Sequence, residues 1–368
     1  MVVLTWGKGI EIPVEIKELC KNVWQQPLDD TSTPRSSIAE AYELLNSIYY
    51  RPLERVLHSV QYLRPELAQL FRDISYDIIW VNRLRIAAFS KHIKGKFRIL
   101  DFDDVHSVLQ KRLAKVKRPR YDPRRYYSLM KAFRIHMLEQ KALRAFDRVA
   151  VCSEKDRQYH SADNVFVIEN CIQIASDIQY TPGRSAHMLY IGPMRYFPNR
   201  DAVRYFTRFI LPKIRQQLPE AHLTVIGSNP SERLINEAKQ AKGVYLTGFV
   251  RDIKPYYEDA ALSIVPLRIG GGTRIKILES LASKVPVVST TIGAEGLNLI
   301  NHEDICIADD PQEFADACIA LLKNQNRREK IALSGYRRVL DLYCPERLEK
   351  TVEAQITTLI QGVKNSAG

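Results

Sequence analysis

Residues 187–340 alternate short apolar runs with longer amphipathic segments, and this alternation constrains the fold more than any other feature of the chain. Runs of four or five apolar residues, such as Leu223–Ile226 and Ala261–Val265, read as strands. Segments such as Asp201–Gln217 instead carry apolar residues at helical spacing. Strands that alternate with helices favour a parallel, doubly wound sheet, so this half of the chain predicts an α/β domain.

The same pattern locates each element of this half. The expected strands are His187–Tyr190, Leu223–Ile226, Val244–Leu246, Ala261–Val265, Val285–Ser289 and Ile305–Ile307. The expected helices are Asp201–Gln217, Ser231–Ala241, Arg274–Ser283, Gln312–Leu322 and Arg327–Leu340. In the first of these helices, the apolar face is expected to consist of Val203, Phe206, Phe209, Ile210 and Ile214.

The first half is less regular. Its expected strands are Val2–Thr5, Asp77–Val81, Phe97–Phe102, Arg148–Cys152 and Asn164–Ile168. A helix is expected at Ile38–Asn46, and long basic helices between the later strands. The stretch Cys171–Ala186, which contains Pro182 and Gly183, is interpreted as the connection between two domains.

Length and composition indicate a soluble two-domain protein. The chain has 368 residues, 45% of them hydrophobic and 26% charged. It contains no apolar stretch of membrane-spanning length, and its start lacks the pattern of a secretory signal. The six cysteines are scattered without a CxxC pair, which favours reduced thiols over a disulfide framework or a zinc site. A cytoplasmic location is therefore predicted.

The formal net charge of +12 is concentrated in one segment. Residues 111–134 hold ten Lys or Arg against one acid, Asp122. Such a block attracts anionic surfaces, either lipid headgroups or a pyrophosphate-bearing acceptor. A solvated basic helix without a partner is the alternative. Nucleic acid is not expected as a partner, because no RNA-binding motif surrounds the tyrosines of this segment.

The segment Gly270–Glu279 predicts an anion site. A strand runs into Gly270, Gly271 and Gly272, and a helix is expected to start beside Thr273. Glycines allow a ligand to approach the backbone, and free amides at a helix start hold anions. Glu279 lies roughly 9 Å along that helix, which suits a diphosphate at the helix start and a ribose at the glutamate. The alternative is a glycine-rich turn whose Lys276 and Glu279 face solvent.

A series of motifs resembles the group 1 (family 4) glycosyltransferases of the GT-B fold. They follow one another at the expected spacing from Tyr190-Ile-Gly192-Pro-Met194 and Pro198-Asn199 through Leu223–Gly227, Leu246–Asp252, Gly270–Glu279, Val285–Thr290, Gly293–Leu297 and Ile307–Asp310. The resemblance is close over residues 185–345, moderate over 76–170 and loose over 1–75. It implies an α/β fold of two Rossmann-like domains that face a cleft. It places an N-terminal acceptor-side domain at 1–170, a C-terminal nucleotide-sugar donor domain at 171–345, and a helix at 346–368 that returns toward the first domain.

The implied activity is transfer of a sugar, of the hexosyltransferase type and with retention of configuration, from a nucleotide diphosphate sugar to a saccharide or lipid-linked acceptor. By position, Glu279 binds the ribose hydroxyls, and the amides of Gly271–Thr273 bind the donor sugar or diphosphate. Lys276 and Arg274 assist the leaving diphosphate. Being two residues apart on a helix, they do not easily face one ligand, and Lys276 is favoured. Phe249 and Val250 flank the base, and Gly192 either contacts a phosphate or simply ends a strand. No metal and no other cofactor is expected.

On the acceptor side, Asp103, Asp104 and His106 follow an expected strand. They are candidates for contacts with the transferred sugar or the acceptor. The alternative is a helix start with Asp104 as its N-cap.

Three departures from the family pattern stand out. Gly271 occupies a position where the family commonly has a glutamate. Pro198-Asn199 stands where a lysine-glycine pair is common, and Arg195 or Arg200 is a possible replacement. The family's first strand and its glycine-rich loop have no counterpart before Val2, so the N-terminal domain is expected to be incomplete.

The expected role is synthesis of a cell-surface polysaccharide or glycolipid, with the basic segment 111–134 at the inner face of the membrane. A non-catalytic nucleotide- or sugar-binding protein of the same fold is the main alternative. An epimerase of this fold would need a general acid/base pair, for which the sequence has no clear candidate.

Overall fold

A computed structural model of the chain describes residues 2–6, 22–26, 75–87, 90, 93–117, 123–173 and 186–366. The chain forms two compact units, Met1–His58 and Ser59–Gly368. In the first unit, strand β1 (Val2–Trp6) pairs in parallel with β2 (Asn22–Gln26), which confirms the strand predicted at Val2–Thr5. The helix predicted at Ile38–Asn46 lies outside the described residues, as does most of the predicted connection between the domains.

The second unit contains a four-stranded parallel sheet whose strands follow chain order. They are β3 (Ser75–Asn82), β4 (Lys94–Asp101), β5 (Arg148–Val151) and β6 (Val165–Val167), each close to a predicted strand. The accompanying helices are α5 (Leu84–Ala87), α6 (His106–Lys117), α7 (Pro123–Ala145) and α8 (Glu154–His160). The polar residues that follow β4 therefore lie at the carboxyl edge of this sheet.

A second sheet of six parallel strands is built from residues 187–307. Its strands are β7 (His187–Ile191), β8 (His222–Ile226), β9 (Val244–Gly248), β10 (Leu262–Val265), β11 (Val287–Ser289) and β12 (Cys306–Ile307). The spatial order β9-β8-β7-β10-β11-β12 is that of a dinucleotide-binding sheet. Because the order reverses between β7 and β10, a crevice for a ligand is expected at their carboxyl ends.

The predicted helices of this region form in the predicted order, and a further helix that was not predicted forms at Lys254–Asp259. The helices are α9 (Phe197–Tyr205), the π-helix η2 (Phe206–Ile210), α10 (Leu211–Gln217), α11 (Glu232–Gln240), α12 (Lys254–Asp259), α13 (Ile275–Ala282), α14 (Pro311–Lys323), α15 (Gln325–Leu342) and α16 (Pro345–Ser366). The helix predicted over Asp201–Gln217 is confirmed, although its π-helical turn was not predicted. The helical segment begins at Phe197 and passes through a π-helical turn, whose wider spacing shifts the side chains that follow. Phe209, predicted to be buried, is therefore 53% exposed, whereas Phe206 is buried.

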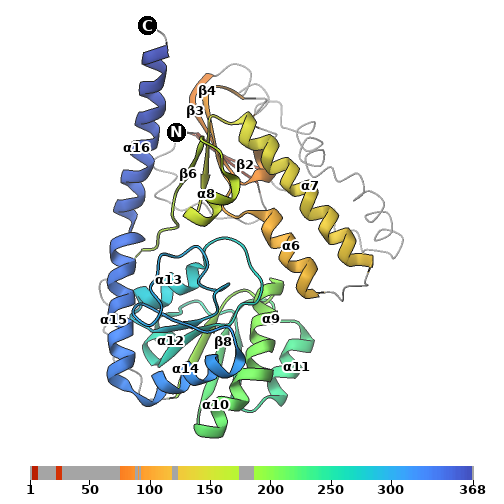
Figure 1. Cartoon of the computed structure of the whole chain (residues 1–368), viewed down its shortest axis with the longest axis vertical. Helices are drawn as coiled ribbons and strands as arrows, with labels where there is room; N and C mark the ends of the chain where they lie inside the picture. The colour runs from red at the N-terminus through yellow and green to blue at the C-terminus, as the bar shows by residue number, and fades with distance from the viewer. Residues whose placement is uncertain are drawn as a thin grey trace. The chain divides into compact units, whose positions relative to one another are not determined.

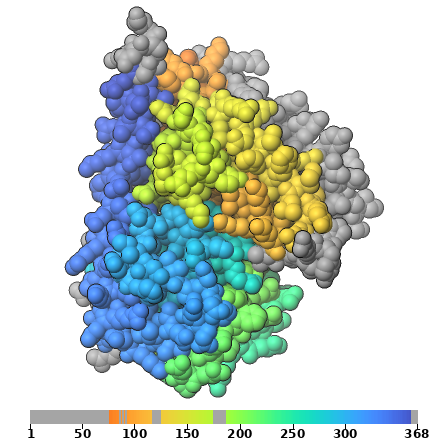
Figure 2. Space-filling view, in the orientation of Figure 1, coloured from red at the N-terminus to blue at the C-terminus, as the bar shows by residue number. Residues whose placement is uncertain are grey.

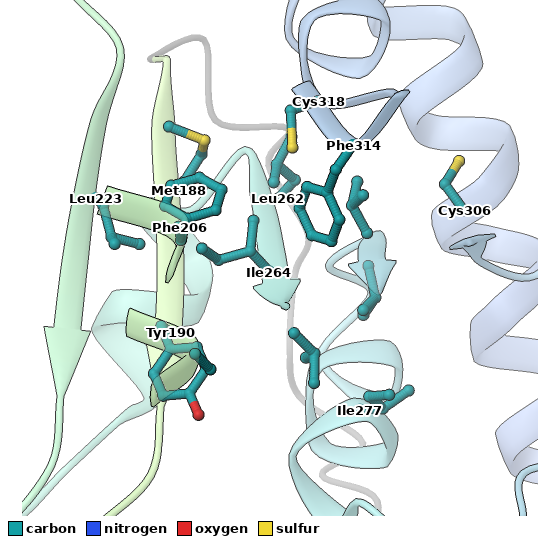
Figure 3. Close-up of a cluster of buried hydrophobic side chains, with 14 of the residues drawn as sticks. Met188, Tyr190, Phe206, Leu223, Leu262, Ile264, Ile277, Cys306, Phe314 and Cys318 are labelled. Carbon is teal, nitrogen blue, oxygen red and sulfur yellow. The ribbon is translucent and has the colours of Figure 1, made fainter. Parts of the chain in front are cut away.

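The core of the six-stranded sheet follows the alternation of side chains along a strand. On β7, Met188 and Tyr190 face one layer of helices and pack in the cluster that contains Phe206 and Phe314 (Figure 3). Leu189, between them, packs on the opposite face against Tyr257 of α12. Burial on both faces explains why this strand reads as a continuous apolar run.

Helix α16 continues beyond α15 and lies beside the four-stranded sheet (Figure 1). There Leu359 is buried with Ile99, Ala150 and Phe166. The domain boundaries at 170 and 345 stay a prediction, as does the absence of the family's first strand. In the described part of the chain, no helix is both long and apolar enough to cross a bilayer.

Candidate functional site

Two loops meet at the carboxyl ends of β7 and β10, where the strand order reverses. The loop after β7 begins with Gly192, and the loop after β10 contains Gly270–Gly272 and leads into α13. A Cβ atom on Gly192 would lie 2.7 Å from both Asn199 Nδ2 and Lys276 Nζ. Gly192 therefore does more than end a strand, because its missing side chain lets a buried amide and an amine approach the backbone.

Lys276 projects from the first turn of α13 toward β7. Its Nζ donates hydrogen bonds to Asn199 Oδ1 at 2.9 Å and to the Tyr190 hydroxyl at 3.1 Å, and it lies 4.3 Å from the centre of the Tyr190 ring. Burial, reinforced by the positive charge of Arg274, lowers the pKa of Lys276 to about 7, and Glu279 partly opposes that shift. The site thus holds an amine whose protonation changes near neutral pH.

Arg274, the N-cap residue of α13, is turned away from Lys276 and into the glycine loop. Its Nη1 donates to the carbonyl oxygens of Gly271 and Gly272, and its side chain is buried. Burial lowers its pKa, against the attraction of Asp104. Arg274 and Lys276 therefore point to different partners, as their spacing predicted. Which of the two contacts a diphosphate stays a prediction.

Glu279 lies three residues beyond Lys276 and is half-buried. Burial raises the pKa of its carboxyl group, and Lys276 partly offsets the increase. Among the described residues, none donates a hydrogen bond to this carboxylate. The alternative in which Lys276 and Glu279 face solvent does not fit, because Lys276 is held by Asn199 and Tyr190 and Glu279 is half-buried. The carboxylate of Glu279 is therefore available to accept hydrogen bonds from the hydroxyl groups of a ligand.

The predicted base contacts follow β9. Phe249 is 75% exposed, and Val250 packs at the edge of the cluster formed by Leu189, Ile226 and Tyr257. Gly248, just before them, has a φ of +76°, a left-handed conformation that suits glycine. The exposed ring of Phe249 leaves an apolar surface beside this turn.

Of the acceptor-side candidates, Asp104 contacts the glycine loop, at Gly272. A Cβ atom on Gly272 would lie 1.5 Å from Asp104 Oδ1, so this carboxylate is pressed against the backbone of the loop. Burial raises the pKa of Asp104, with Asp103 adding to the increase. Asp103 instead forms an ion pair with Arg83 at 3.2 Å, and His106 is the first residue of α6.

The N-cap alternative for Asp104 is not what the structure shows. The amide of Ser107 in the first turn of α6 donates to Glu139 Oε1 at 3.0 Å, so a carboxylate from α7 satisfies this helix end. Burial raises the pKa of Glu139, because its carboxylate is almost completely removed from solvent.

The sequence did not single out several residues of this site. Arg112 Nη1 on α6 donates to the Gly270 carbonyl at 2.7 Å, and the guanidinium also binds both carboxylate oxygens of Glu295. Lys155 Nζ lies 2.5 Å from the same carboxylate. Arg112 belongs to the basic segment 111–134, where it was counted as part of an anion-attracting surface. The only sequence signal for this contact was the motif Gly293–Leu297, which carries Glu295.

Arg200 does not replace the missing lysine, contrary to one expectation. Its Nη1 donates to the carbonyls of Met194 and Arg195 at 2.8 and 2.7 Å, so it supports its own loop. Lys276 reaches the space beside Gly192 instead, and Asn199, which stands in the place of the family's glycine, holds its amine.

The comparisons with known proteins agree with this geometry. Residues 185–324 match the family model described as glycosyl transferases group 1. Both loops of the site lie within this match. Residues 185–324 are a group 1 glycosyltransferase domain. Within it lie the donor-side candidates Gly192, Phe249, Val250, Gly270, Gly271, Gly272, Thr273, Arg274, Lys276 and Glu279.

A curated relative of this chain is an uncharacterized 44.6 kDa protein in the cps region of Klebsiella pneumoniae. It is 23% identical over 176 residues, which are 46% of this chain and 45% of the relative. The match thus spans less than half the length of the curated relative.

Solved glycosyltransferases share the fold over nearly the whole chain. Sucrose-phosphate synthase from Thermosynechococcus elongatus has a TM-score of 0.69 at 16% identity, covering 98% of this chain and 89% of that one. Anabaena HepE, solved in complex with UDP and glucose, has a TM-score of 0.61 at 13% identity, covering 93% of this chain and 88% of that one. At these identities the likeness shows the fold, which is GT-B, with its two Rossmann-like domains.

Proposed function

We propose that this protein is a glycosyltransferase that moves a hexose, with retention of configuration, from a nucleotide diphosphate sugar to a saccharide or lipid-linked acceptor in the synthesis of a cell-surface polysaccharide or glycolipid. One observation carries the proposal. The amine of Lys276 is held beside Gly192 by Asn199 and Tyr190, at the start of the helix that also carries Glu279. The anion site and the hydroxyl acceptor that a nucleotide sugar requires thus lie on one helix.

Each charged group of the site is assigned to a different part of the donor. The ammonium form of Lys276 and the amides at the start of α13 stabilise the negative charge that grows on the diphosphate as the glycosidic bond breaks. No described residue donates a hydrogen bond to Glu279, and its carboxylate accepts hydrogen bonds from the two hydroxyl groups of the ribose. Phe249 and Val250 flank the base. Asp104, pressed against Gly272, lies where it can orient the transferred sugar or the acceptor hydroxyl.

Two relatives suggest the first substrates to test. HepE was solved with UDP and glucose, and the Klebsiella relative is encoded in a cps region. UDP-glucose is therefore the first donor to try. The proposal requires no metal, because positive side chains and the helix start supply the charge.

The test is thermal stabilisation by a panel of UDP-, GDP- and ADP-linked sugars, followed by turnover assays. A donor at about 100 times its Kd should add about 2.7 kcal/mol to the free energy of unfolding. Glu279→Ala should abolish the shift, whereas Glu349→Ala, an exposed glutamate on α16, should keep it. Stabilisation and turnover together support the proposal. Stabilisation without turnover, tried with saccharide and lipid-linked acceptors, would indicate the non-catalytic alternative. No stabilisation by any donor would refute both.

The proposal includes peripheral binding to an anionic membrane on the cytoplasmic side, supported by the outer face of α7. Tyr126, Met130, Phe133 and Met137 are spaced by four, three and four residues and are each 54–61% exposed. Their helix lies at the surface (Figure 2). It overlaps the basic segment 111–134, and aromatic and methionine side chains beside positive charge suit a lipid interface.

Cosedimentation with vesicles that contain anionic lipid tests this part. Replacing both Phe133 and Met137 with Ser should weaken binding, as should reversing the charges of Arg118, Arg120, Arg124 and Arg125. Phe209→Ser, which removes an equally exposed phenylalanine from η2, is the matched control. Vesicle binding that is unchanged in both sets of variants, or that does not depend on salt concentration, would refute the membrane proposal. It would not bear on the proposed donor site.

A further inference from the structure

Three successive carbonyl groups of the glycine loop are held by arginines. Arg112 Nη1 donates to the Gly270 carbonyl at 2.7 Å. Arg274 Nη1 donates to the carbonyls of Gly271 and Gly272. Every carbonyl in this stretch therefore faces a positive charge.

The amides must point the other way. In a planar trans peptide, the carbonyl of one residue and the amide of the next are antiparallel. The N–H groups of Gly271, Gly272 and Thr273 consequently face away from the guanidinium that holds the preceding carbonyl. The Thr273 amide is directed to the Cys152 thiol. Within the described residues, the amides of Gly271 and Gly272 donate no hydrogen bond, and successive free backbone amides of this kind can bind an anion.

We infer that Arg112 is a positioning residue for the donor, which keeps the amides of Gly271 and Gly272 turned toward the diphosphate or the sugar. The inference rests on the proposed function. Without the bond from Arg112, the peptide between Gly270 and Gly271 is free to rotate. After such a rotation, the Gly270 carbonyl oxygen would point where the Gly271 N–H group had pointed, and it would repel an anion.

The position of Arg112 depends on contacts outside the glycine loop. Its guanidinium binds both carboxylate oxygens of Glu295, which also binds Lys155 on α8. The three residues join α6 and α8 to the loop at 293–296. The amides are therefore set correctly only while α6 stays in contact with the donor domain. Arg112 makes the anion site conditional on that contact.

The experiment compares Arg112→Ala and Arg112→Lys with Lys115→Ala, which removes an exposed positive charge from the same helix. The readouts are kcat and KM for the nucleotide sugar that the unsubstituted chain uses, and binding of inorganic pyrophosphate by calorimetry. For Arg112→Ala we expect kcat and pyrophosphate affinity to fall about tenfold or more, by analogy with the loss of an oxyanion donor. Arg112→Lys should recover only part of this, since an ammonium cannot bind both Glu295 and the Gly270 carbonyl in the same fork. Lys115→Ala should leave both quantities unchanged.

A merely structural role gives a different result. Lys155 still pairs with Glu295 in Arg112→Ala, so the variant should fold, and its melting temperature should stay close to that of Lys115→Ala. Equal kinetics and equal pyrophosphate binding in Arg112→Ala and Lys115→Ala would overturn the inference while the proposed function stands. A failure of the unsubstituted chain to bind any nucleotide sugar would instead defeat the proposed function. If the unsubstituted chain binds a nucleotide sugar but not inorganic pyrophosphate, the proposed anion site is refuted.

Discussion

Lys276 Nζ lies 2.9 Å from Asn199 Oδ1, although the two residues are 77 positions apart in the chain. Asn199 also accepts a hydrogen bond from the Tyr190 hydroxyl and donates one to the Pro193 carbonyl. The side-chain amide of Asn199 is thus held by Tyr190 and Pro193 independently of its hydrogen bond with Lys276. Asn199 positions Lys276 at the carboxyl end of β7, where the diphosphate is proposed to bind.

The pKa of Lys276, about 7, makes UDP binding sensitive to pH. Below pH 7 the amine is already charged. Above pH 7 it is neutral in the free protein, and an adjacent diphosphate restores the charge. Binding of UDP at pH 8 should therefore take up a proton, and affinity should fall as pH rises, by at most about tenfold per pH unit. Titration calorimetry in two buffers of different ionisation enthalpy measures the uptake.

Lys276→Met is the control for that measurement, because it keeps the length of the side chain and removes the titrating group. Proton uptake at pH 8 should disappear in this variant. Equal uptake in both proteins would show that Lys276 does not face the diphosphate.

Gly272→Ala should damage the protein more than Gly271→Ala. Gly272 has a φ of +68°, and its Cβ would lie 1.5 Å from Asp104 Oδ1. A Cβ on Gly271 would lie 3.3 Å from Leu109 Cβ and 3.8 Å from the Val105 carbonyl oxygen, which are contacts without severe overlap. We expect a loss of about 1–3 kcal/mol in the free energy of unfolding and weaker donor binding for Gly272→Ala. Chemical denaturation and the thermal-shift panel measure both effects.

Adding Asp104→Ala to Gly272→Ala separates the two causes, because it removes the steric contact but leaves the backbone strain. Partial recovery of stability is expected. If the double variant is no more stable than the sum of the single effects predicts, Asp104 is not in contact with Gly272.

Phe206→Ala should cost about 3–5 kcal/mol of stability, as for other large core residues, whereas Phe209→Ala should stay within about 0.5 kcal/mol of the unsubstituted protein. Phe206 is fully buried against Phe314, but the π-helical turn leaves Phe209 half exposed. Urea denaturation of the two variants measures the difference. Similar losses for both would mean that Phe209 is buried and that the segment continues as a regular α-helix.

Asp304→Asn should destabilise the protein by about 2 kcal/mol at pH 7. The buried carboxylate accepts hydrogen bonds from the Ile300 amide, Ser334 and Arg338, and these keep its pKa below the usual range despite burial. A depressed pKa contributes stability above the unfolded value of about 4, and the contribution is lost as pH falls through the native value. The difference between the two proteins should therefore shrink below about pH 4 in unfolding curves measured from pH 7 to 3. A difference that is independent of pH would contradict this account.

The sequence by itself determined the order and type of most elements. Apolar runs such as Leu223–Ile226 predict strands because each side chain along a parallel strand is buried on one face or the other. The glycine loop at Gly270–Gly272 and the helix that carries Lys276 and Glu279 were equally local features. These patterns depend on residues only a few positions apart, so they are readable from one chain.

Only the tertiary structure decided which residues share the site. Arg112 and Gly270 are 158 positions apart, and no local pattern relates them. The same holds for Asn199 and Lys276, and for Asp104 and Gly272. The π-helical turn at Phe206–Ile210 also escaped prediction, because it shifts the helical register without changing the apolar composition. Contacts of this kind depend on how packed elements meet, and their free energy is not encoded in the spacing of neighbouring residues.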